Sequence, residues 1–185
     1  MSKIKQLLGN FSSYIEVPWR DDSSAEERVV FCVYSEYEEC RLRFTIDEFE
    51  IATKKAGHEW AIFDLTHTFA EWLAPQPYAK SYYQKPHLIK TLLPKYLLYL
   101  DHKFTHFIER EACNKNTVIA LKGVGSLFGL LKVKCLVDQL APHSKGRLLV
   151  FFPGSYISKD NNYRLFDAYD GWNYLAAPIT AETTF

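Results

Sequence analysis

The sequence predicts an α/β fold, in which helices cover both faces of a parallel or mixed central sheet to form a three-layer sandwich. Short apolar runs that suit buried strands alternate with segments of helical periodicity, and the runs lie at 29–34, 60–65, 118–121 and 148–152. Of 185 residues, 48% are hydrophobic and 24% charged, which is typical of one soluble globular unit. We therefore expect a single α/β domain over 1–185, with a P-loop-NTPase-like or Rossmann-like topology that lacks a Walker A motif.

The N-terminal segment, residues 1–19, is expected to be a docking helix. Apolar side chains recur at helical spacing over 2–16, and Pro18 closes the segment. Such a stripe packs on a core more often than it binds a membrane, which is the alternative. The next run, at 29–34, is rich in β-branched and aromatic residues and predicts a strand buried on both faces.

The following helix carries a start signal and a stop signal. Thr45 and Glu48 have the spacing of a capping box, and Gly57 favours termination, so we expect a helix that Thr45 caps. The strand at 60–65 comes next, and Thr66 is expected to cap a short helix after it. Strand and helix therefore alternate up to this point.

Residues 67–112 interrupt the alternation with a helical excursion. From Leu88 onward, apolar residues at steps of three and four predict a long amphipathic helix, with Pro94 at its start or as a kink. Three tyrosines near lysines form a candidate partner surface: Tyr78, Tyr82 and Tyr83. Tyrosine and lysine suit protein interfaces and nucleic-acid stacking alike, and an ordinary, partly exposed helix surface is the alternative.

A glycine-rich loop is the candidate ligand site. It follows the strand predicted at 118–121 and precedes a helix predicted at 127–140, a position where open α/β sheets bind ligands. The candidate anion-binding residues are Lys122, Gly123, Gly125 and Ser126. The glycines permit close backbone approach, and free amides at a helix start favour an anion. The alternative is a tight strand-to-helix turn, because a P-loop ends in Gly-Lys-Ser/Thr and this loop has no such lysine.

Three further groups match catalytic or metal-binding patterns only in part. Asp64 ends a strand as a magnesium-positioning carboxylate does, but capping a helix is the commoner role. Asp167 and Asp170 can form an acid pair, or can simply hold an Asp-Gly reversal between two extended segments. His102 and His106 share one helix face without a recognisable third zinc ligand, so a solvated face is favoured.

The last long strand and the bulk composition complete the expectations. The run at 148–152 is expected to stop at Pro153. Balanced charge, with 22 basic and 22 acidic residues, disfavours general nucleic-acid binding. The four cysteines lie far apart, which disfavours a zinc site or a disulfide scaffold, and no apolar run is long enough to cross a membrane. We expect a cytoplasmic protein that uses no cofactor or metal.

Long strings of the sequence, among them VIALKGVGSLFG and NYRLFDAYDGWNYL, resemble the BrxB family of BREX bacteriophage-exclusion systems. The resemblance covers almost the whole chain and is carried by 28–34, 47–54, 63–66, 116–129, 146–154 and 162–175. It implies a bacterial cytoplasmic protein within a defence system that methylates host DNA and blocks phage replication. It also implies partners, with the PglZ phosphatase-like protein first and the ATPase and methyltransferase components next. It supplies no catalytic residues.

Three hypotheses follow for the function. The preferred one is a non-catalytic assembly or regulatory subunit that binds PglZ through residues 78–108 or through the N-terminal helix. The second is a divergent nucleotide- or phosphate-binding domain that uses the loop 123–126. The third is a DNA-contacting accessory subunit with a local basic patch, whose affinity would fall steeply as salt rises.

Overall fold

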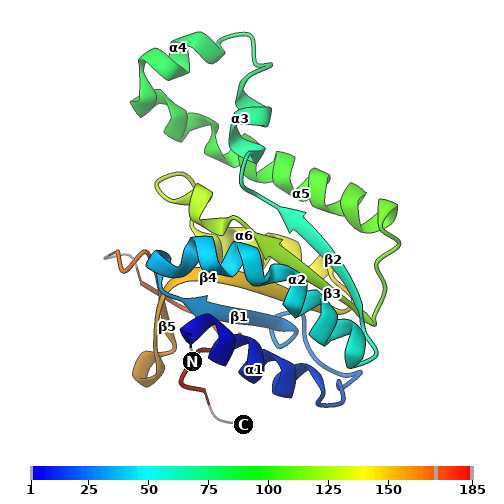
Figure 1. Cartoon of the computed structure of the whole chain (residues 1–185). Coiled ribbons are helices and arrows are strands. Elements are labelled where there is room, and N and C mark those ends of the chain that lie inside the picture. The colour runs from blue at the N-terminus through cyan, green and yellow to red at the C-terminus, as the bar shows by residue number, and fades with distance from the viewer. Residues whose placement is uncertain (1, 169–170, 184–185) are drawn as a thin grey trace.

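A mostly parallel sheet forms the centre of the computed structural model, which describes residues 2–168 and 171–183. Along the sheet the strands follow the order β2-β3-β4-β1-β7, each parallel to its neighbours. Their bounds are β1 Val29–Tyr34, β2 Glu59–Asp64, β3 Thr117–Lys122, β4 Arg147–Ile157 and β7 Ala177–Ile179. Helices cover both faces (Figure 1), so the expected α/β three-layer sandwich is confirmed.

Helices α1 and α2 cover one face of the sheet. The sequence predicts a helix over 2–16, and α1 spans Lys3–Ile15; α2 spans Glu39–Lys55. The ring of Phe11 in α1 lies 5.2 Å from that of Phe49 in α2, which lies 5.1 Å from Phe151 in β4. All three rings are buried. Burial of apolar surface, which stabilises by roughly 25 cal/mol per Å², therefore holds both helices on this face.

The opposite face is covered by α3 Thr68–Leu73, α5 Leu93–Arg110 and α6 Val133–Leu140. Phe63 of β2 packs edge-on against Phe104 of α5, with ring centroids 5.1 Å apart. Pro94 lies in the first turn of α5, where its missing N–H costs no intrahelical hydrogen bond. The predicted long helix is confirmed from Leu93, with the proline at its start, whereas residues 88–92, expected in the same helix, belong to a 3-10 segment.

The predicted cap of α2 at Thr45 is wrong. The helix already begins at Glu39, and the Thr45 hydroxyl donates to a main-chain carbonyl of the preceding turn, 2.8 Å away. Leu42 and Ile46 are buried in one stripe, so burial extends the helix upstream of the capping signature. The predicted stop is confirmed, because Gly57 follows the helix with a φ of +87°, a conformation that favours glycine.

Two other helix boundaries also differ from the prediction. Thr66 does not cap α3, because the N-cap position is His67 and the Thr66 hydroxyl donates to the carboxylate of Asp64. The helix expected at 127–140 is shorter and comprises only α6, because Val124–Leu127 form a separate 3-10 turn and Gly129 has a φ of +75°. The 3-10 turn and α6 both bury leucines in the same core, so the apolar pattern along the sequence resembles that of one continuous helix.

Strand β4 continues through Pro153, where the sequence predicts a stop. Beyond this residue β4 pairs antiparallel with β5 (Asn162–Leu165), which pairs antiparallel with β6 (Trp172–Asn173). The proline is tolerated because it is the last residue paired with β1, and its carbonyl accepts a hydrogen bond from the Phe166 amide at 3.0 Å. The β5–β6 pairing agrees with a chain reversal between extended segments, although residues 169–170 lie outside the described residues.

The helical excursion stands away from the sheet as a lobe (Figure 1). After α3 it comprises α4 (Ala79–Gln84), a 3-10 segment (Pro86–Leu92) and the start of α5. At its base, the buried hydroxyls of Tyr96 and Thr68 lie 2.7 Å apart and share a hydrogen bond. By contrast, α4 and the 3-10 segment, both fully described, bury no residue. The outer lobe is therefore held mainly through its base.

Candidate functional site

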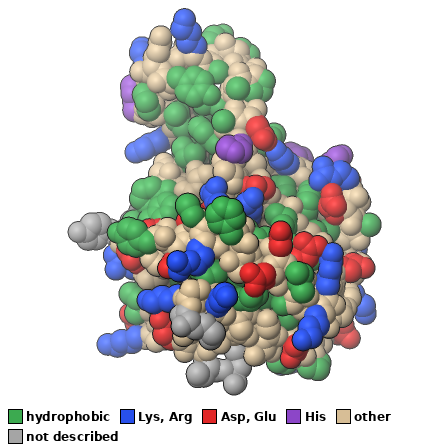
Figure 2. Space-filling model, in the orientation of Figure 1, with side chains coloured by type: hydrophobic (Ala, Val, Ile, Leu, Met, Phe, Trp, Pro, Cys, Tyr) green, Lys and Arg blue, Asp and Glu red, His purple; other side chains and the backbone are tan. Residues whose placement is uncertain are grey.

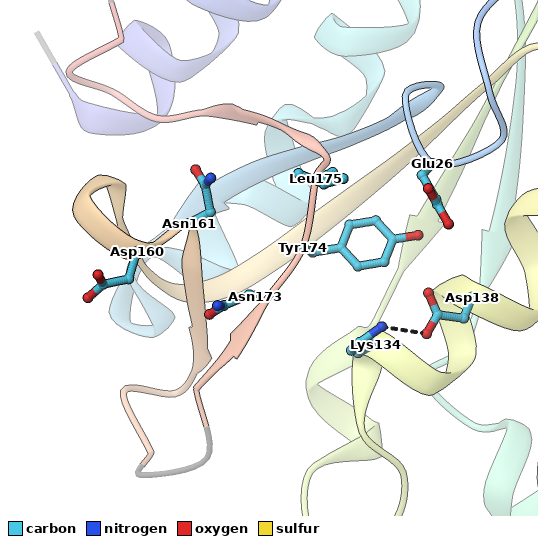
Figure 3. A pocket seen from close by; sticks show the side chains of 8 residues that line it. All are labelled: Glu26, Lys134, Asp138, Asp160, Asn161, Asn173, Tyr174 and Leu175. Atoms are coloured by element: carbon cyan, nitrogen blue, oxygen red, sulfur yellow. Dashed lines mark hydrogen bonds and ion pairs between the residues drawn. The ribbon is translucent and has the colours of Figure 1, made fainter.

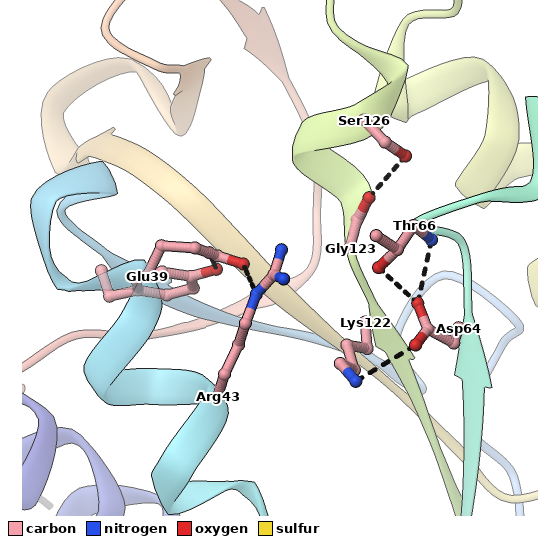
Figure 4. Close-up of polar contacts among 8 residues, drawn as sticks. Glu39, Arg43, Asp64, Thr66, Lys122, Gly123 and Ser126 are labelled. Atoms are coloured by element: carbon pink, nitrogen blue, oxygen red, sulfur yellow. Dashed lines mark hydrogen bonds and ion pairs between the residues drawn. The ribbon is translucent and has the colours of Figure 1, made fainter.

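Polar side chains from β2, β3 and α2 meet at the carboxyl edge of the sheet (Figure 4). All strands of a parallel sheet end at one edge, and ligands of open α/β sheets bind there. The residues brought together are Glu39, Arg43, Asp64, Thr66, Lys122, Gly123 and Ser126. Sequence reasoning predicted Asp64, Lys122, Gly123 and Ser126 as candidates but missed Glu39 and Arg43. The available signal was their four-residue spacing after a buried strand, which favours an ion pair on one helix face.

Asp64 and Lys122 form an ion pair between the carboxyl ends of β2 and β3. The lysine Nζ lies 3.1 Å from one carboxylate oxygen, and the amide of Thr66 donates to the other at 2.9 Å. Partial burial raises the pKa of the Asp64 carboxyl, but the hydrogen bonds from Thr66 and Lys122 outweigh it and lower the pKa below 3.8. The carboxylate therefore stays ionised and neutralises the lysine that was predicted to attract an anion.

The two loop glycines make room for protein atoms. Gly123 has a φ of +78°, and a Cβ there would collide with Thr66, whose backbone nitrogen would lie 2.8 Å away. A Cβ on Gly125 would lie 2.7 Å from the ring of Phe166, which comes from the segment after β5. The Ser126 hydroxyl lies within hydrogen-bond distance of two carbonyls, at 2.8 Å from Gly123 and 3.0 Å from Leu65. Close internal packing explains why small residues occupy this loop.

A second ionic group completes the carboxyl edge beside β1. Tyr34 donates its hydroxyl hydrogen to Glu39, and the same carboxylate accepts from Arg43 Nε at 2.8 Å (Figure 4). Burial raises the pKa of the Tyr34 phenol, and the neighbouring Glu39 raises it further. The four charged groups Glu39, Arg43, Asp64 and Lys122 thus form two pairs of opposite sign.

This geometry favours the tight-turn interpretation of the glycine loop. The loop enters the 3-10 turn Val124–Leu127 and not an α-helix, so no long helix dipole is directed at it. Lys122 and Ser126 already have partners. Anion binding by the loop stays a prediction.

The other polar groups considered from the sequence are separate in space. His102 and His106 are exposed on α5 and line an open hollow of about 570 Å³. Within residues 2–168 and 171–183, no group of three or more His, Cys, Asp or Glu side chains is arranged to hold a metal ion. Arg164 donates to the main-chain carbonyl of Asp167 at 3.0 Å and, within the described residues, forms no ion pair with the Asp167 side chain. Asp170 lies outside the described residues.

A polar hollow of about 360 Å³ lies between α6 and the β5–β6 hairpin (Figure 3). Its lining residues are Glu26, Lys134, Asp138, Asp160, Asn161, Asn173, Tyr174 and Leu175. Lys134 and Asp138 form an ion pair at 2.8 Å, and the Lys134 ammonium lies 5.4 Å from the Tyr174 ring centroid. Burial raises the pKa of the Tyr174 phenol, and Asp138 and Glu26 raise it further. Tyr174 therefore lines this hollow with a neutral, protonated phenol.

The lobe carries the candidate tyrosine surface. Tyr78 is 71% exposed and Tyr83 is 56% exposed, whereas Tyr82 is half-buried against the core. None of residues 74–95, all of which the structure describes, is buried. Between Glu71 and Asp101 the chain has no acidic residue, and its basic residues there are Lys80, Lys85, Lys90 and Lys95. Figure 2 accordingly shows hydrophobic and basic side chains over the lobe.

An apolar hollow of about 650 Å³ lies where the lobe meets the sheet. Lys90 and Leu93 line it from the lobe, and residues 128–133 and Trp172 line it from the sheet side. Phe128, at its border, is 53% exposed and packs against the ring of Phe166 at 5.2 Å. Apolar surface is therefore accessible at the base of the lobe as well as on its tip.

Comparison with known proteins assigns a family. The family model described as "BREX protein BrxB" matches residues 66–178, which is more than half of the chain and includes the lobe, the glycine loop and the β4–β5 hairpin. No curated protein and no solved structure matches the chain. Within the described residues, no helix is both long and apolar enough to span a bilayer. The resemblance read from the sequence is confirmed, and the chain belongs to the BrxB family of BREX proteins.

Proposed function

We propose that this chain is a non-catalytic assembly or regulatory subunit of a BREX anti-phage defence system, acting in the cytoplasm. In this proposal, residues 74–95 of the lobe bind another component of the system, and the PglZ phosphatase-like protein is the first candidate. Family membership supports a place in the BREX system. The lobe supports a role in binding.

The observation that carries the proposal is the lack of burial in the outer lobe. Fixing the backbone of a residue costs about 1–2 kcal/mol, and side-chain burial normally offsets this cost. Residues 74–95 adopt defined helical structure without a single buried side chain. A partner that covers the exposed rings of Tyr78 and Tyr83 would supply the missing burial, since tyrosine contributes strongly at interface centres.

Charge indicates the kind of protein surface that fits. The whole chain has no net charge, yet the segment between Glu71 and Asp101 contains lysines and no carboxylate. A complementary face would combine acidic side chains with an apolar centre, so its association rate should fall as the salt concentration rises. The ATPase and methyltransferase components are further candidates by the same criterion.

The carboxyl edge of the sheet supports the non-catalytic part of the proposal. The charged groups Asp64, Lys122, Glu39 and Arg43 neutralise one another, and the glycine loop is packed against Thr66 and Phe166; all of these contacts lie within the described chain. The competing hypothesis, a nucleotide-binding domain, requires those groups to be released. Thermal unfolding with ATP, GTP and dinucleotides, with and without magnesium, tests it, because a bound nucleotide must raise Tm.

Co-expression with PglZ, followed by size-exclusion chromatography with light scattering, tests the proposal. We expect a stable complex that the double variant Tyr78→Asp/Tyr83→Asp no longer forms. The matched control is Tyr37→Asp, because Tyr37 is 90% exposed and lies outside the lobe. The proposal fails if no complex forms, or if both variants retain it equally. Loss of duplex DNA binding in the double variant, with PglZ binding intact, would favour the DNA-contacting role in its place.

A further inference from the structure

A basic hollow of about 400 Å³ lies at the amino ends of the parallel strands, at the opposite edge of the sheet from the glycine loop. The segments that enter β1, β2, β3 and β4 all contribute to it. Its lining residues are Trp19, Arg20, Asp21, Arg28, His58, Lys115, Asn116, Lys145, Gly146 and Arg147. Five of them are basic and one is acidic, although the chain as a whole is neutral.

Arg147, the first residue of β4, is the centre of this hollow. It is only 8% exposed, and its Nε is buried without a hydrogen-bond partner among the described residues. Nor does any carboxylate of the described chain lie within ion-pair distance of its guanidinium. The guanidinium instead lies 5.1 Å from the centre of the Trp19 ring, a cation–π contact that offsets only part of the cost of burying a charge.

The neighbouring cations are held in place or directed to solvent. Arg28 donates to the carbonyls of Ser23 at 2.7 Å and Ser144 at 3.0 Å, and its own Nε is likewise buried without a partner among the described residues. Lys115 has an 81% exposed side chain and lies 3.9 Å from Asp21, too far for a strong ion pair. Positive charge is therefore in excess around the hollow.

Arg20 adds little to this excess, because Asp22 accepts two hydrogen bonds from its guanidinium, at 2.9 and 3.1 Å. Lys145 is exposed beside Arg147 and has no ion pair in the described part of the chain. Within the described part of the chain, the charges without a close carboxylate partner are thus Arg28, Lys115, Lys145 and Arg147. Arg28, Lys145 and Arg147 come from the starts of β1 and β4, which pair side by side in parallel, and Lys115 lies just before β3.

We infer that this hollow binds a phosphoryl oxyanion. A phosphoryl group carries up to two negative charges and three acceptor oxygens, so it can use two guanidinium groups and a lysine together, whereas a carboxylate has one charge and two oxygens. The Trp19 ring is covered by His58 on one side, at 3.9 Å and nearly parallel, and contacts Arg147. Recognition is therefore by charge, without stacking of a base on this ring.

The phosphoryl group can belong to a small phosphate compound or to the backbone of a nucleic acid, and titration distinguishes the two. We would titrate the full chain with inorganic phosphate, with pyrophosphate and with a short DNA duplex, at constant ionic strength and with chloride as the reference anion. The charge-reversal variant is Lys115→Glu/Lys145→Glu, because both lysines are exposed and their replacement leaves the core intact. Lys159→Glu, exposed on a distant turn, is the matched control.

We expect phosphate or pyrophosphate to bind and raise Tm, with affinity reduced about tenfold or more in Lys115→Glu/Lys145→Glu and unchanged in Lys159→Glu. Arg147→Met should abolish binding. If it fails to fold, the lysine variant still decides the question. Binding of the duplex alone, with the same dependence on the lysines, assigns the site to a nucleic-acid backbone. Equal binding by both glutamate variants, or no binding beyond that seen with chloride, overturns the inference.

Discussion

Replacement of Gly123 by alanine tests whether the glycine loop is shaped by internal packing. An L-residue in the left-handed region costs about 1–2 kcal/mol, and Gly123 has a φ of +78°. The new Cβ would also lie 2.8 Å from the backbone nitrogen of Thr66 and 3.0 Å from its Cα, which cannot rotate away. Forced displacement of packed atoms adds about 1–3 kcal/mol, so we expect a total loss of about 2–5 kcal/mol.

Gly57→Ala is a matched control for this substitution. Its φ of +87° is similar, but a Cβ there would meet nothing within 4 Å, so only the backbone cost of about 1–2 kcal/mol applies. Urea unfolding at equilibrium measures both losses, provided that the slope of unfolding free energy against urea is unchanged. Each kcal/mol should also lower Tm by about 2–4 °C for a chain of this size. Equal losses for the two variants, within about 0.5 kcal/mol, would refute the packing explanation of the loop.

Three further predictions concern buried and titrating groups. Tyr96→Phe removes a buried hydrogen bond at the base of the lobe and should cost about 1 kcal/mol in urea unfolding; no loss would mean that the hydroxyl is dispensable. Because the folded-state pKa of Asp64 is lowered, its stabilisation is complete above pH 3.8 and is lost as the pH falls through the lower folded value. The Asp64→Asn variant should therefore lose less unfolding free energy than the native chain on acidification, by a small difference because the carboxylate is half-exposed. Equal losses in the two proteins would contradict this. The exposed thiols of Cys40 and Cys135 should react rapidly with a thiol reagent. Burial raises the pKa of the Cys32 thiol and should delay its reaction until the chain unfolds; equal rates for the three thiols would contradict the described burial.

The four longest strands, β1 to β4, could be predicted from the sequence because each contains a continuous apolar run. β1 and β3 are buried along almost their whole length, so the run itself carries the signal. Helix starts were less predictable. At Thr45 a local capping signature competed with the buried stripe that begins at Leu42, and burial decided the outcome. Local signals fail where tertiary packing is stronger.

The candidate sites illustrate the same limit. The position of the glycine loop was predictable, because it depends on the order of strand and turn along the chain. The reason for its glycines was not, since Thr66 and Phe166 come from distant segments. In the sequence, Arg147 is simply a basic residue that precedes an apolar run. Only the structure shows that it is buried and that the parallel register of β1 and β4 places it in one hollow with Arg28.

Hydrogen–deuterium exchange of this chain, alone and at saturating PglZ, tests the central claim most directly. Amides in residues 74–95 should exchange rapidly in the free chain, because none of these residues is buried. We predict that PglZ slows exchange in this segment and leaves the carboxyl edge of the sheet, around Asp64 and Lys122, unchanged. Unaltered exchange in 74–95, or protection confined to the carboxyl edge, would contradict the account of the lobe as the binding surface.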